Sequence, residues 1–283
     1  MFDESGEIAV VYNGEIYKFR ELQSELEARG YRFRTRCDTE VILHAWRAWG
    51  EACVERFRGM FAFGLWDRRS ETLFLARDRL GIKPLYYAAL PNGQLVFASE
   101  LKAVMLHPDA PRRMDPHAVE EYFAFGYVPD PKTIFRGVHK LAPAHRLSVR
   151  RGQPAPEPQC YWKLDFAERF HAGSADELGG ELIERLREAV DIRRVADVPL
   201  GAFLSGGVDS SAVVAMMAEA GGDPVLTSSI SFGDPQFNEA AYAEQVARQY
   251  GTDHGTREVS PDDFSLVNQL AGLYDEPFAD SSA

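Results

Sequence analysis

The stretch "FLSGGVDSS", residues 203–211, decides the fold expected for the second half of the chain. It overlaps an apolar run, "VPLGAFL", and leads into "SSAVVAMMAEAGG", patterns that predict a buried strand and a helix closed by glycines. Such a loop lies at the carboxyl edge of a sheet, where open α/β folds bind ligands. The first helical turn offers unpaired N–H groups to an anion, and glycines let the backbone approach it closely. The sequence therefore predicts a phosphate-binding loop.

The loop also carries hydroxyl donors and one carboxylate. We expect Asp209 to contact phosphate only through a divalent cation, because two negative charges repel each other. The pattern contains neither GxxxxGK[ST] nor GxGxxG, which excludes a Walker A loop and argues against a dinucleotide fold. The plainer alternative is a Gly-Gly turn that joins the strand to the helix without a ligand.

The segments around this loop predict a parallel sheet. Strands are expected at "VLTSSISF" and "GTREVS", and helices at "ELGGELIERLREAVDIRR", "EAAYAEQVARQYG" and "PDDFSLVNQLAGLY". Alternating strands and helices are typical of parallel strands joined by helical crossovers.

The first half of the chain predicts a β-rich domain with helices. Strands are expected at "EIAVVYN" and "YRFRT", in a hairpin of "MFAFGLWD" and "TLFLARD", and in a pair, "PLYYAAL" and "QLVFAS", joined by the turn "PNG". Helices are expected at "YKFRELQSELEARG" and "TEVILHAWRAWG", with Asp38 as the N-cap of the second. The Pro-rich segment "RRGQPAPEPQ" predicts a linker, so we expect domains at 1–150 and 176–283 with a linker at 151–175.

Composition limits the kinds of partner. The net charge of −12 argues against nucleic acid, whose phosphates an acidic chain repels. No apolar run approaches membrane-spanning length, and "MFDESGEIAV" lacks the pattern of a signal peptide. The three cysteines are few and widely spaced, so neither a disulfide framework nor a zinc site is predicted. We therefore expect a cytoplasmic protein.

A second set of motifs precedes the loop. In order, these are "NGEIY", "DTEVIL", "GMFAFGLWD", "RDRLGIKPLYY" and "FASELKAV". Together with the SGGxDS pattern, which resembles the PP-loop of N-type ATP pyrophosphatases, they resemble glutamine-hydrolysing asparagine synthetase over nearly the whole chain. The resemblance implies an α/β protein in two parts: an α+β glutaminase domain of the N-terminal-nucleophile hydrolase type, then a parallel-sheet, adenine-nucleotide α-hydrolase-like PP-loop domain.

The resemblance implies roles for individual residues of the glutaminase part. Asn13 and Gly14 would form the oxyanion hole, through a side-chain amide and a backbone N–H. Glu15 would line the glutamine pocket, and Asp38 would pair with the α-ammonium group of glutamine. The plain structural alternatives are a turn for Asn13 and Gly14, and a helix cap for Asp38.

In the synthetase part, the resemblance implies that the loop binds the β- and γ-phosphates of ATP with Mg²⁺ held at Asp209. The residues assigned to phosphate are Ser205, Gly206, Gly207, Asp209 and Ser210. Leu204 and Phe232 match positions that contact adenosine. Asp280 and Ser281 match a stretch near the active site, without an assigned role. The expected partners are glutamine, aspartate and ATP, and a homodimer stays open.

Other candidates have structural interpretations. For Arg77, Arg79 and Lys83 in "RDRLGIKPLYY" we favour a structural role over a catalytic one. His44 is expected to be ordinary helix surface or core.

The sequence also departs from the family pattern. The family nucleophile is a cysteine at position 1, whose own α-amine acts as the base, whereas this chain begins Met1-Phe2. A second family loop of the SGxGxDE type does not follow the PP-loop here. We expect a chain truncated at both ends that does not hydrolyse glutamine and does not complete ligation as written.

Several functions stay open at this point. The first is asparagine synthesis from aspartate through an aspartyl-adenylate. A variant of this hypothesis is a related amidotransferase or β-lactam synthetase that acts on another carboxylate. The second hypothesis, from a different functional class, is a non-catalytic paralogue that binds nucleotide. Another PP-loop ligase is disfavoured by the glutaminase motifs upstream of the loop.

Overall fold

The computed structural model describes residues 1–166, 173–234, 236, 238–259 and 272–279. By its internal contacts the chain divides into two compact units. The first comprises Met1–Phe166 together with Val267–Ala283, and the second comprises Ala167–Leu266. The domain boundaries expected at 150 and 175 stay a prediction.

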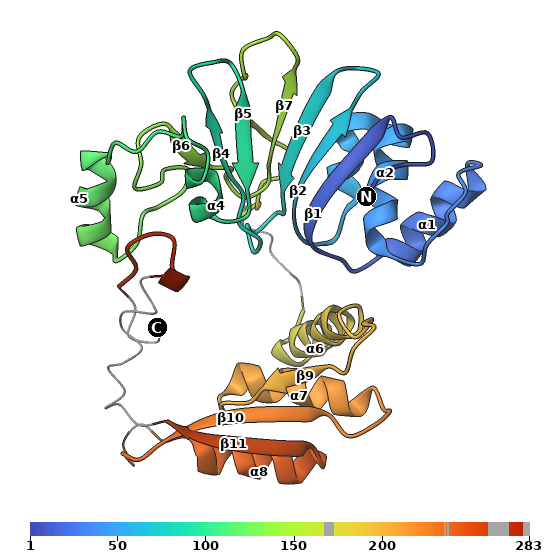
Figure 1. The fold of residues 1–283 in the computed structure, drawn as a ribbon. Coiled ribbons are helices and arrows are strands. Elements are labelled where there is room, and N and C mark those ends of the chain that lie inside the picture. The colour runs from blue at the N-terminus through green and yellow to red at the C-terminus, as the bar shows by residue number, and fades with distance from the viewer. Residues whose placement is uncertain (167–172, 235, 237, 260–271, 280–283) are drawn as a thin grey trace. The chain divides into compact units, whose positions relative to one another are not determined.

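The first unit is built on a five-stranded antiparallel sheet of order β1-β2-β3-β7-β8 (Figure 1). Its strands are β1 (Ile8–Ile16), β2 (Gly59–Asp67), β3 (Thr72–Arg77), β7 (His145–Arg150) and β8 (Gln159–Cys160). Helices α1 (Phe19–Ala28) and α2 (Asp38–Trp49) cover one face, followed by the short helices η1 (Gly50–Ala52) and α3 (Cys53–Arg56). The predicted β2–β3 hairpin is confirmed.

Strand β2 is buried on both faces, which explains why its sequence is apolar almost without alternation. Phe61, Phe63 and Leu65 pack toward the helices, with Ile42 and Phe74 in the same cluster. On the opposite face, Ala62 belongs to a separate cluster that joins the two sheets.

A second, three-stranded antiparallel sheet packs on that opposite face. It consists of β5 (Leu95–Ala98), β4 (Tyr86–Ala89) and β6 (Val138–Lys140), and α4 (Leu101–Met105) and α5 (Pro116–Phe125) lie beside it. The two sheets are so close at Gly64 that a Cβ there would lie 2.4 Å from the ring of Phe97. The predicted turn "PNG" joins β4 to β5, as expected.

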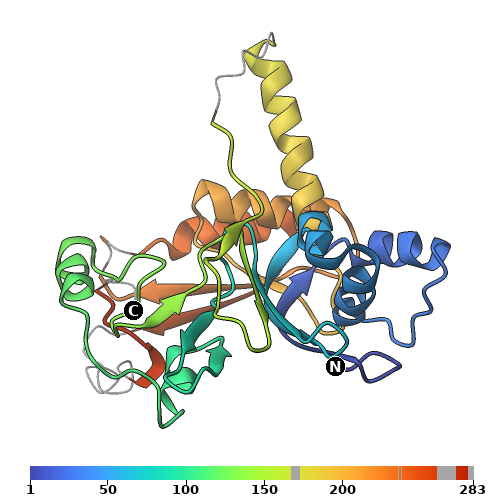
Figure 2. The same ribbon diagram turned by 90° about the horizontal axis from the view of Figure 1, so that it is seen from above.

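The second unit holds a parallel sheet of order β11-β10-β9 (Figures 1 and 2). The strands are β9 (Gly201–Phe203), β10 (Leu226–Phe232) and β11 (Asp253–Val259), and the helices are α6 (Ala175–Asp191), α7 (Val208–Glu219) and α8 (Ala240–Tyr250). Leu204, Val214, Ala243 and Ala247 form its buried core. The α/β fold class, with a parallel sheet after an antiparallel β-rich part, is confirmed. The helix predicted at 261–274 falls almost entirely outside the described residues.

Two local predictions were wrong. Residues 31–35, "YRFRT", form no strand, because the carboxylate of Glu40 accepts the backbone N–H groups of Arg34 (2.9 Å) and Thr35 (2.7 Å) that a strand would offer to a neighbour. Asp38 is not the N-cap of α2. The helix begins at Asp38 itself, Cys37 occupies the cap position, and the Asp38 carboxylate turns toward β1 instead.

The segment 77–83 is held by buried charges, which supports the structural interpretation of Arg77. The Arg77 guanidinium donates to the carbonyls of Gly81, Lys83 and Leu141 and to Asp130, at 2.8 Å each. His44 is buried between the rings of Tyr31 and Phe33, as expected for a core residue.

The fully buried carboxylate of Asp78 closes the same segment. It accepts the backbone N–H groups of Phe61, Leu80, Ile82 and Lys83 at 3.0–3.2 Å.

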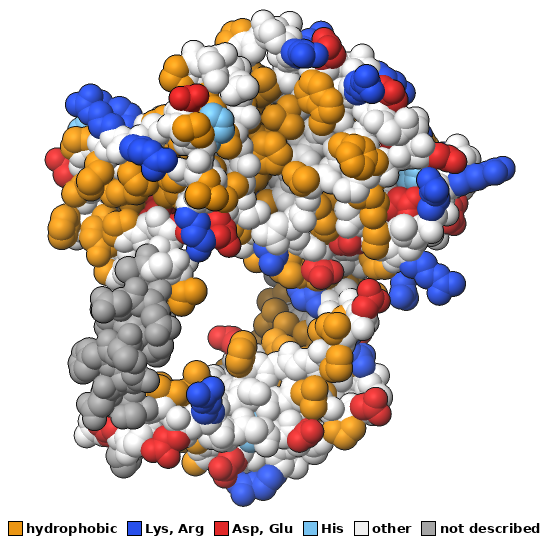
Figure 3. Space-filling view, viewed as in Figure 1, with side chains coloured by type: hydrophobic (Ala, Val, Ile, Leu, Met, Phe, Trp, Pro, Cys, Tyr) orange, Lys and Arg blue, Asp and Glu red, His pale blue; other side chains and the backbone are white. Residues whose placement is uncertain are grey.

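Acidic and basic side chains are interspersed on the surface that Figure 3 shows. None of the helices among the described residues is long and apolar enough to span a membrane.

Replacing Asp78 with Ala is expected to destabilise the first unit by about 3 kcal/mol, because several buried N–H groups lose their acceptor at once. Urea unfolding followed by tryptophan fluorescence measures this, since all four tryptophans lie in the first unit. The matched control is Asp109→Ala, at an exposed position. Equal midpoints for the two variants would contradict the role of Asp78.

Acidification tests the Glu40 contact. Burial acts to raise the pKa of Glu40, but hydrogen bonds from the Thr35 hydroxyl and from the amides of Arg34 and Thr35 outweigh it and hold the pKa below the ordinary value of 4.5. A depressed folded-state pKa means that the stabilisation is complete above the ordinary pKa and is lost as pH falls through the folded-state pKa.

We therefore expect the wild type to exceed Glu40→Gln in free energy of unfolding at neutral pH, with the difference shrinking as the pH falls below the ordinary value of 4.5. Urea unfolding of both chains across this range measures it. A difference that stays constant with pH would show that the charge of Glu40 is not responsible.

Candidate functional site

The first candidate site lies on β1, where the predicted glutaminase residues are found. Asn13 and Gly14 are not in a turn. They lie within the strand, opposite Ala62 and Phe61 of β2. Gly14 has φ +149°, and a Cβ there would lie 2.1 Å from the carbonyl oxygen of Met60, so the contact between β1 and β2 requires glycine.

Asn13 lines a cavity of about 250 Å³ between the two sheets of the first unit. Its amide Nδ2 donates to the hydroxyl of Ser99 at 3.3 Å. Ser99, Phe97 and Val11 line the same cavity. Sequence reasoning missed Ser99 as a site residue, although it lies in the quoted motif "FASELKAV".

Asp38 is tied to β1 through one carboxylate oxygen. Its Oδ2 accepts from the hydroxyl of Tyr12 at 2.6 Å and from the backbone N–H of Ile16 at 2.8 Å. Burial raises the pKa of Tyr12, and the hydrogen bond to Asp38 and the charges of Asp38 and Glu15 raise it further, so Tyr12 stays a neutral donor. Asn13, Gly14, Glu15 and Asp38 therefore lie in one region of β1 and the start of α2. Tyr12 was not predicted.

None of the three cysteines lies at position 1. Cys53 is fully buried, and burial raises the pKa of its thiol, which makes it a poor nucleophile. Cys160 is exposed and donates to the carbonyl of Trp162.

The second candidate site is the loop of residues 204–207 between β9 and α7. Gly206 has φ +82°, and a Cβ there would lie 2.5 Å from Cβ of Tyr242 and 2.7 Å from the backbone nitrogen of Ala243. The loop is therefore pressed against α8 and requires glycine at this position.

The serines of this loop contact each other. The hydroxyls of Ser205 and Ser210 are 3.0 Å apart, the backbone N–H of Gly207 donates to Ser205, and the Ser210 hydroxyl donates to the carbonyl of Gly207. Asp209 is exposed in the first turn of α7. Among the residues that the structure describes, no group of three or more His, Cys, Asp or Glu side chains could hold a metal ion.

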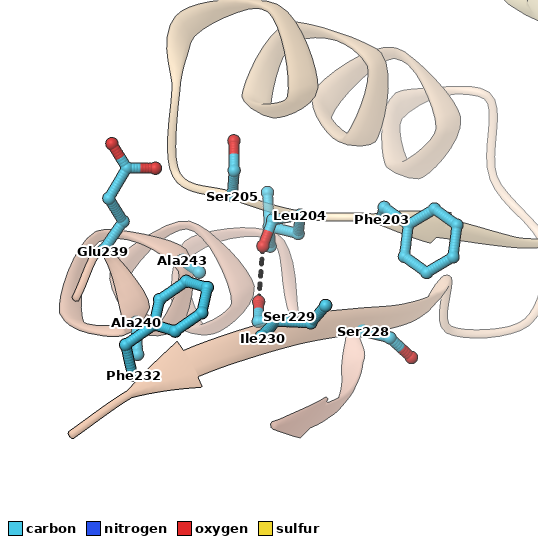
Figure 4. Close-up of a pocket in the computed structure, with 10 residues that line it drawn as sticks. All are labelled: Phe203, Leu204, Ser205, Ser228, Ser229, Ile230, Phe232, Glu239, Ala240 and Ala243. Atoms are coloured by element: carbon cyan, nitrogen blue, oxygen red, sulfur yellow. Dashed lines mark hydrogen bonds between the residues drawn. The ribbon is translucent and has the colours of Figure 1, made fainter. Parts of the chain in front are cut away.

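A cavity of about 310 Å³ adjoins the loop at Ser205 (Figure 4). Leu204 and Phe232, the predicted adenosine contacts, both line it. The Ser229 hydroxyl donates to the carbonyl of Leu204, which ties β10 to the start of the loop. Gly206, Gly207, Asp209 and Ser210 are not among its lining residues. Glu239 and Ala240 line it and were not predicted. Asp280 and Ser281 lie outside the described residues.

Comparisons with known proteins match both parts of the chain. A family model described as "Glutamine amidotransferase domain" matches residues 1–162, and one described as "Asparagine synthase" matches residues 181–283. These matches define a two-part amidotransferase.

The similar curated proteins include asparagine synthetase [glutamine-hydrolyzing] 1 of Bacillus subtilis, 36% identical over 97% of this chain and 43% of its own length. A putative asparagine synthetase 2 of Methanocaldococcus jannaschii is 37% identical over 99% of this chain and 54% of its own length. Amidase chry2 of Gibberella zeae is 35% identical over 87% of this chain and 37% of its own length.

Among solved structures, the chain is similar to a glutamine phosphoribosylpyrophosphate amidotransferase from B. subtilis, with 14% identity, a TM-score of 0.40, and coverage of 98% of this chain and 75% of that one. The chain belongs to the asparagine synthase family of glutamine amidotransferases. It spans 37% to 54% of the length of the curated relatives named here.

Substitution of the loop glycine tests its contact with α8. Gly206→Ala is expected to destabilise the second unit by about 3 kcal/mol, because the methyl group meets the backbone of α8. Gly251→Ala is the matched control, since Gly251 also has positive φ (+62°) but no atom within 4 Å of the place its methyl group would take. Its expected cost is about 1 kcal/mol from backbone strain alone.

Amide exchange of residues 201–259 measures the difference, because tryptophan fluorescence does not report on this unit. Equal acceleration of exchange in the two variants would show that strain, and not the contact with α8, sets the need for glycine.

Proposed function

We propose that this chain carries the glutamine-binding and ATP-binding parts of an ATP-dependent amide ligase. In the proposed reaction, glutamine hydrolysis supplies ammonia, and ATP activates aspartate as β-aspartyl-AMP with release of pyrophosphate. Ammonia then displaces AMP and forms asparagine. The observation that carries this proposal is the loop of residues 204–207, which opens α7 beside an apolar cavity of about 310 Å³.

The cavity and the loop suit different parts of ATP. The cavity is lined mostly by apolar groups, including Leu204, Ile230 and Phe232, which suits a purine ring. The loop and the first turn of α7 offer backbone N–H groups and the positive end of a helix to phosphates. Ser205 belongs to both, so we assign it to the junction of nucleoside and phosphate. Gly206, Gly207 and Ser210 are assigned to the β- and γ-phosphates.

Asp209 is the proposed Mg²⁺ ligand. Mg²⁺ keeps several waters and binds through one or two carboxylates together with substrate phosphates, so a single exposed carboxylate at the phosphate loop fits it. The ion would neutralise the phosphates and let Asp209 approach them.

On the glutaminase side, we assign the Asn13 amide and the Gly14 N–H to the oxyanion, Glu15 to the lining of the glutamine pocket, and Asp38 to the α-ammonium group of glutamine. The Asn13 amide already lies in a cavity, and the Asp38 carboxylate is held in place by Tyr12 and Ile16. Fixed donors and charges of this kind stabilise a developing charge without reorganisation.

The second candidate function differs from the first in the carboxylate that is amidated. Amidase chry2 is among the similar proteins, which favours a second candidate, amidation of a carboxylate other than aspartate. A non-catalytic nucleotide-binding role is a third. Exchange of labelled pyrophosphate into ATP separates them: exchange with aspartate supports asparagine synthesis, exchange with another acid supports the second, and ATP binding without exchange supports the third.

Asp209→Asn tests the metal site. We expect about tenfold weaker binding of ATP in the presence of Mg²⁺, and no weakening when Mg²⁺ is chelated, because the carboxylate acts only through the ion. Isothermal titration measures both. Asp223→Asn is the control, since Asp223 is exposed and follows the opposite end of α7. Equal weakening with and without Mg²⁺ would contradict a metal-binding role.

A further inference from the structure

Residues 272–279, "GLYDEPFA", pack on the first unit, although the asparagine synthase model that matches residues 181–283 includes them. We call this segment the docking strip. It contacts the first unit through side chains and backbone, near α4, α5 and β6.

Glu276 makes the central contact. Its Oε1 accepts the backbone N–H of Ile134 at 2.7 Å, and its Oε2 pairs with Lys140 of β6 at 2.6 Å. Both charged side chains are well shielded, with exposed fractions of 11% for Glu276 and 13% for Lys140. Lys140 also donates to the carbonyl of Val128 at 2.7 Å. A charge-assisted contact in such a shielded place is much stronger than a surface ion pair.

Weaker contacts flank Glu276 on both sides. Asp275 pairs with Lys102 at 3.3 Å, and the exposed Lys102 also reaches the carbonyl of Gly272. At the other end, the backbone N–H of Ala279 donates to the carbonyl of Gly126, the residue that ends α5, at 2.8 Å. The strip is therefore anchored at three places along its length.

The negative charges of the strip also act on a half-buried tyrosine. Burial raises the pKa of Tyr86 on β4, and the charges of Glu276 and Asp275 raise it further. Tyr86 lies opposite Lys140 in the β4–β6 pairing. The charge of Glu276 thus pairs with Lys140 and also acts on Tyr86, which stays neutral.

From these contacts we infer that the amidotransferase unit holds residues 272–279 in place, and that this docking depends on the Glu276–Lys140 pair. The consequence for acceptor binding rests on the proposed function, because the docking strip belongs to the stretch that the asparagine synthase model matches. The docking itself does not depend on that function.

Hydrogen–deuterium exchange of the whole chain tests the docking at the amides of Ile134 and Ala279. Glu276→Ala removes both contacts of the carboxylate, so we expect exchange at the two amides to become roughly tenfold to a hundredfold faster. Lys140→Met removes the ion pair and the hydrogen bond to the carbonyl of Val128 but leaves the contact between Glu276 and Ile134, so it should give a smaller acceleration at Ile134. Lys132→Met is the matched control, because Lys132 pairs with Glu121 and not with a residue of the strip.

Tryptophan fluorescence checks that each variant is folded. Should Glu276→Ala unfold the unit, Glu276→Gln serves instead, because it keeps an acceptor for Ile134 and loses only the charge. Unchanged exchange at Ala279 in a folded Glu276 variant, or equal acceleration in Lys132→Met, would overturn the proposal.

Pyrophosphate exchange tests the functional consequence. For Glu276→Gln we expect the acceptor KM to rise about tenfold with no change in the KM for ATP. Parallel changes in both constants would overturn the positioning role. Absence of exchange in the wild type would count against the proposed function, and the amide exchange would still decide whether the strip docks.

Discussion

Burial of β2 on both faces is the constraint on which the first unit depends. Phe61, Phe63 and Leu65 fill the layer under α2, and the opposite face meets the second sheet so closely that Gly64 leaves room only for the ring of Phe97. A strand enclosed in this way has one register. It therefore fixes β1 beside it, and with β1 the depth at which Asn13 enters the cavity between the sheets.

The second unit uses a close contact of the same kind to shape its loop. Gly206 lies against Tyr242 and Ala243 of α8, so the loop that opens α7 takes its form from a helix that comes later in the chain. The mutual contact of Ser205 and Ser210 then closes the loop from within. The shape of this loop is thus set by contacts within the protein, which under the proposed function would lower the entropy lost when phosphate binds.

Much of this arrangement could be predicted from sequence, because it follows from local patterns. The strand–loop–helix unit around "SGGVDSS", both hairpins and most of the helices have periodicities or turn residues that act over a few positions. Residues 31–35 show where such reasoning fails. Their alternating pattern favours a strand, but Glu40 takes the N–H groups that a strand would need, and no local pattern reports where a carboxylate points.

The same limit explains which site residues were missed. Ser99 contacts Asn13 across a separation of 86 residues, and Glu276 contacts Ile134 across 142, so only the fold brings them together. In a sequence, a carboxylate that binds a ligand looks the same as one that binds a backbone amide. Under the proposed function Asp38 would do both, with Tyr12 and Ile16 donating to one of its carboxylate oxygens. Glu276 already has two partners, the Ile134 amide and Lys140, so we assign it a role in holding the chain. The asparagine synthase model matches residues 181–283, whereas the internal contacts of the chain place residues 267–283 in the first unit. The docking strip lies where these two divisions of the chain differ.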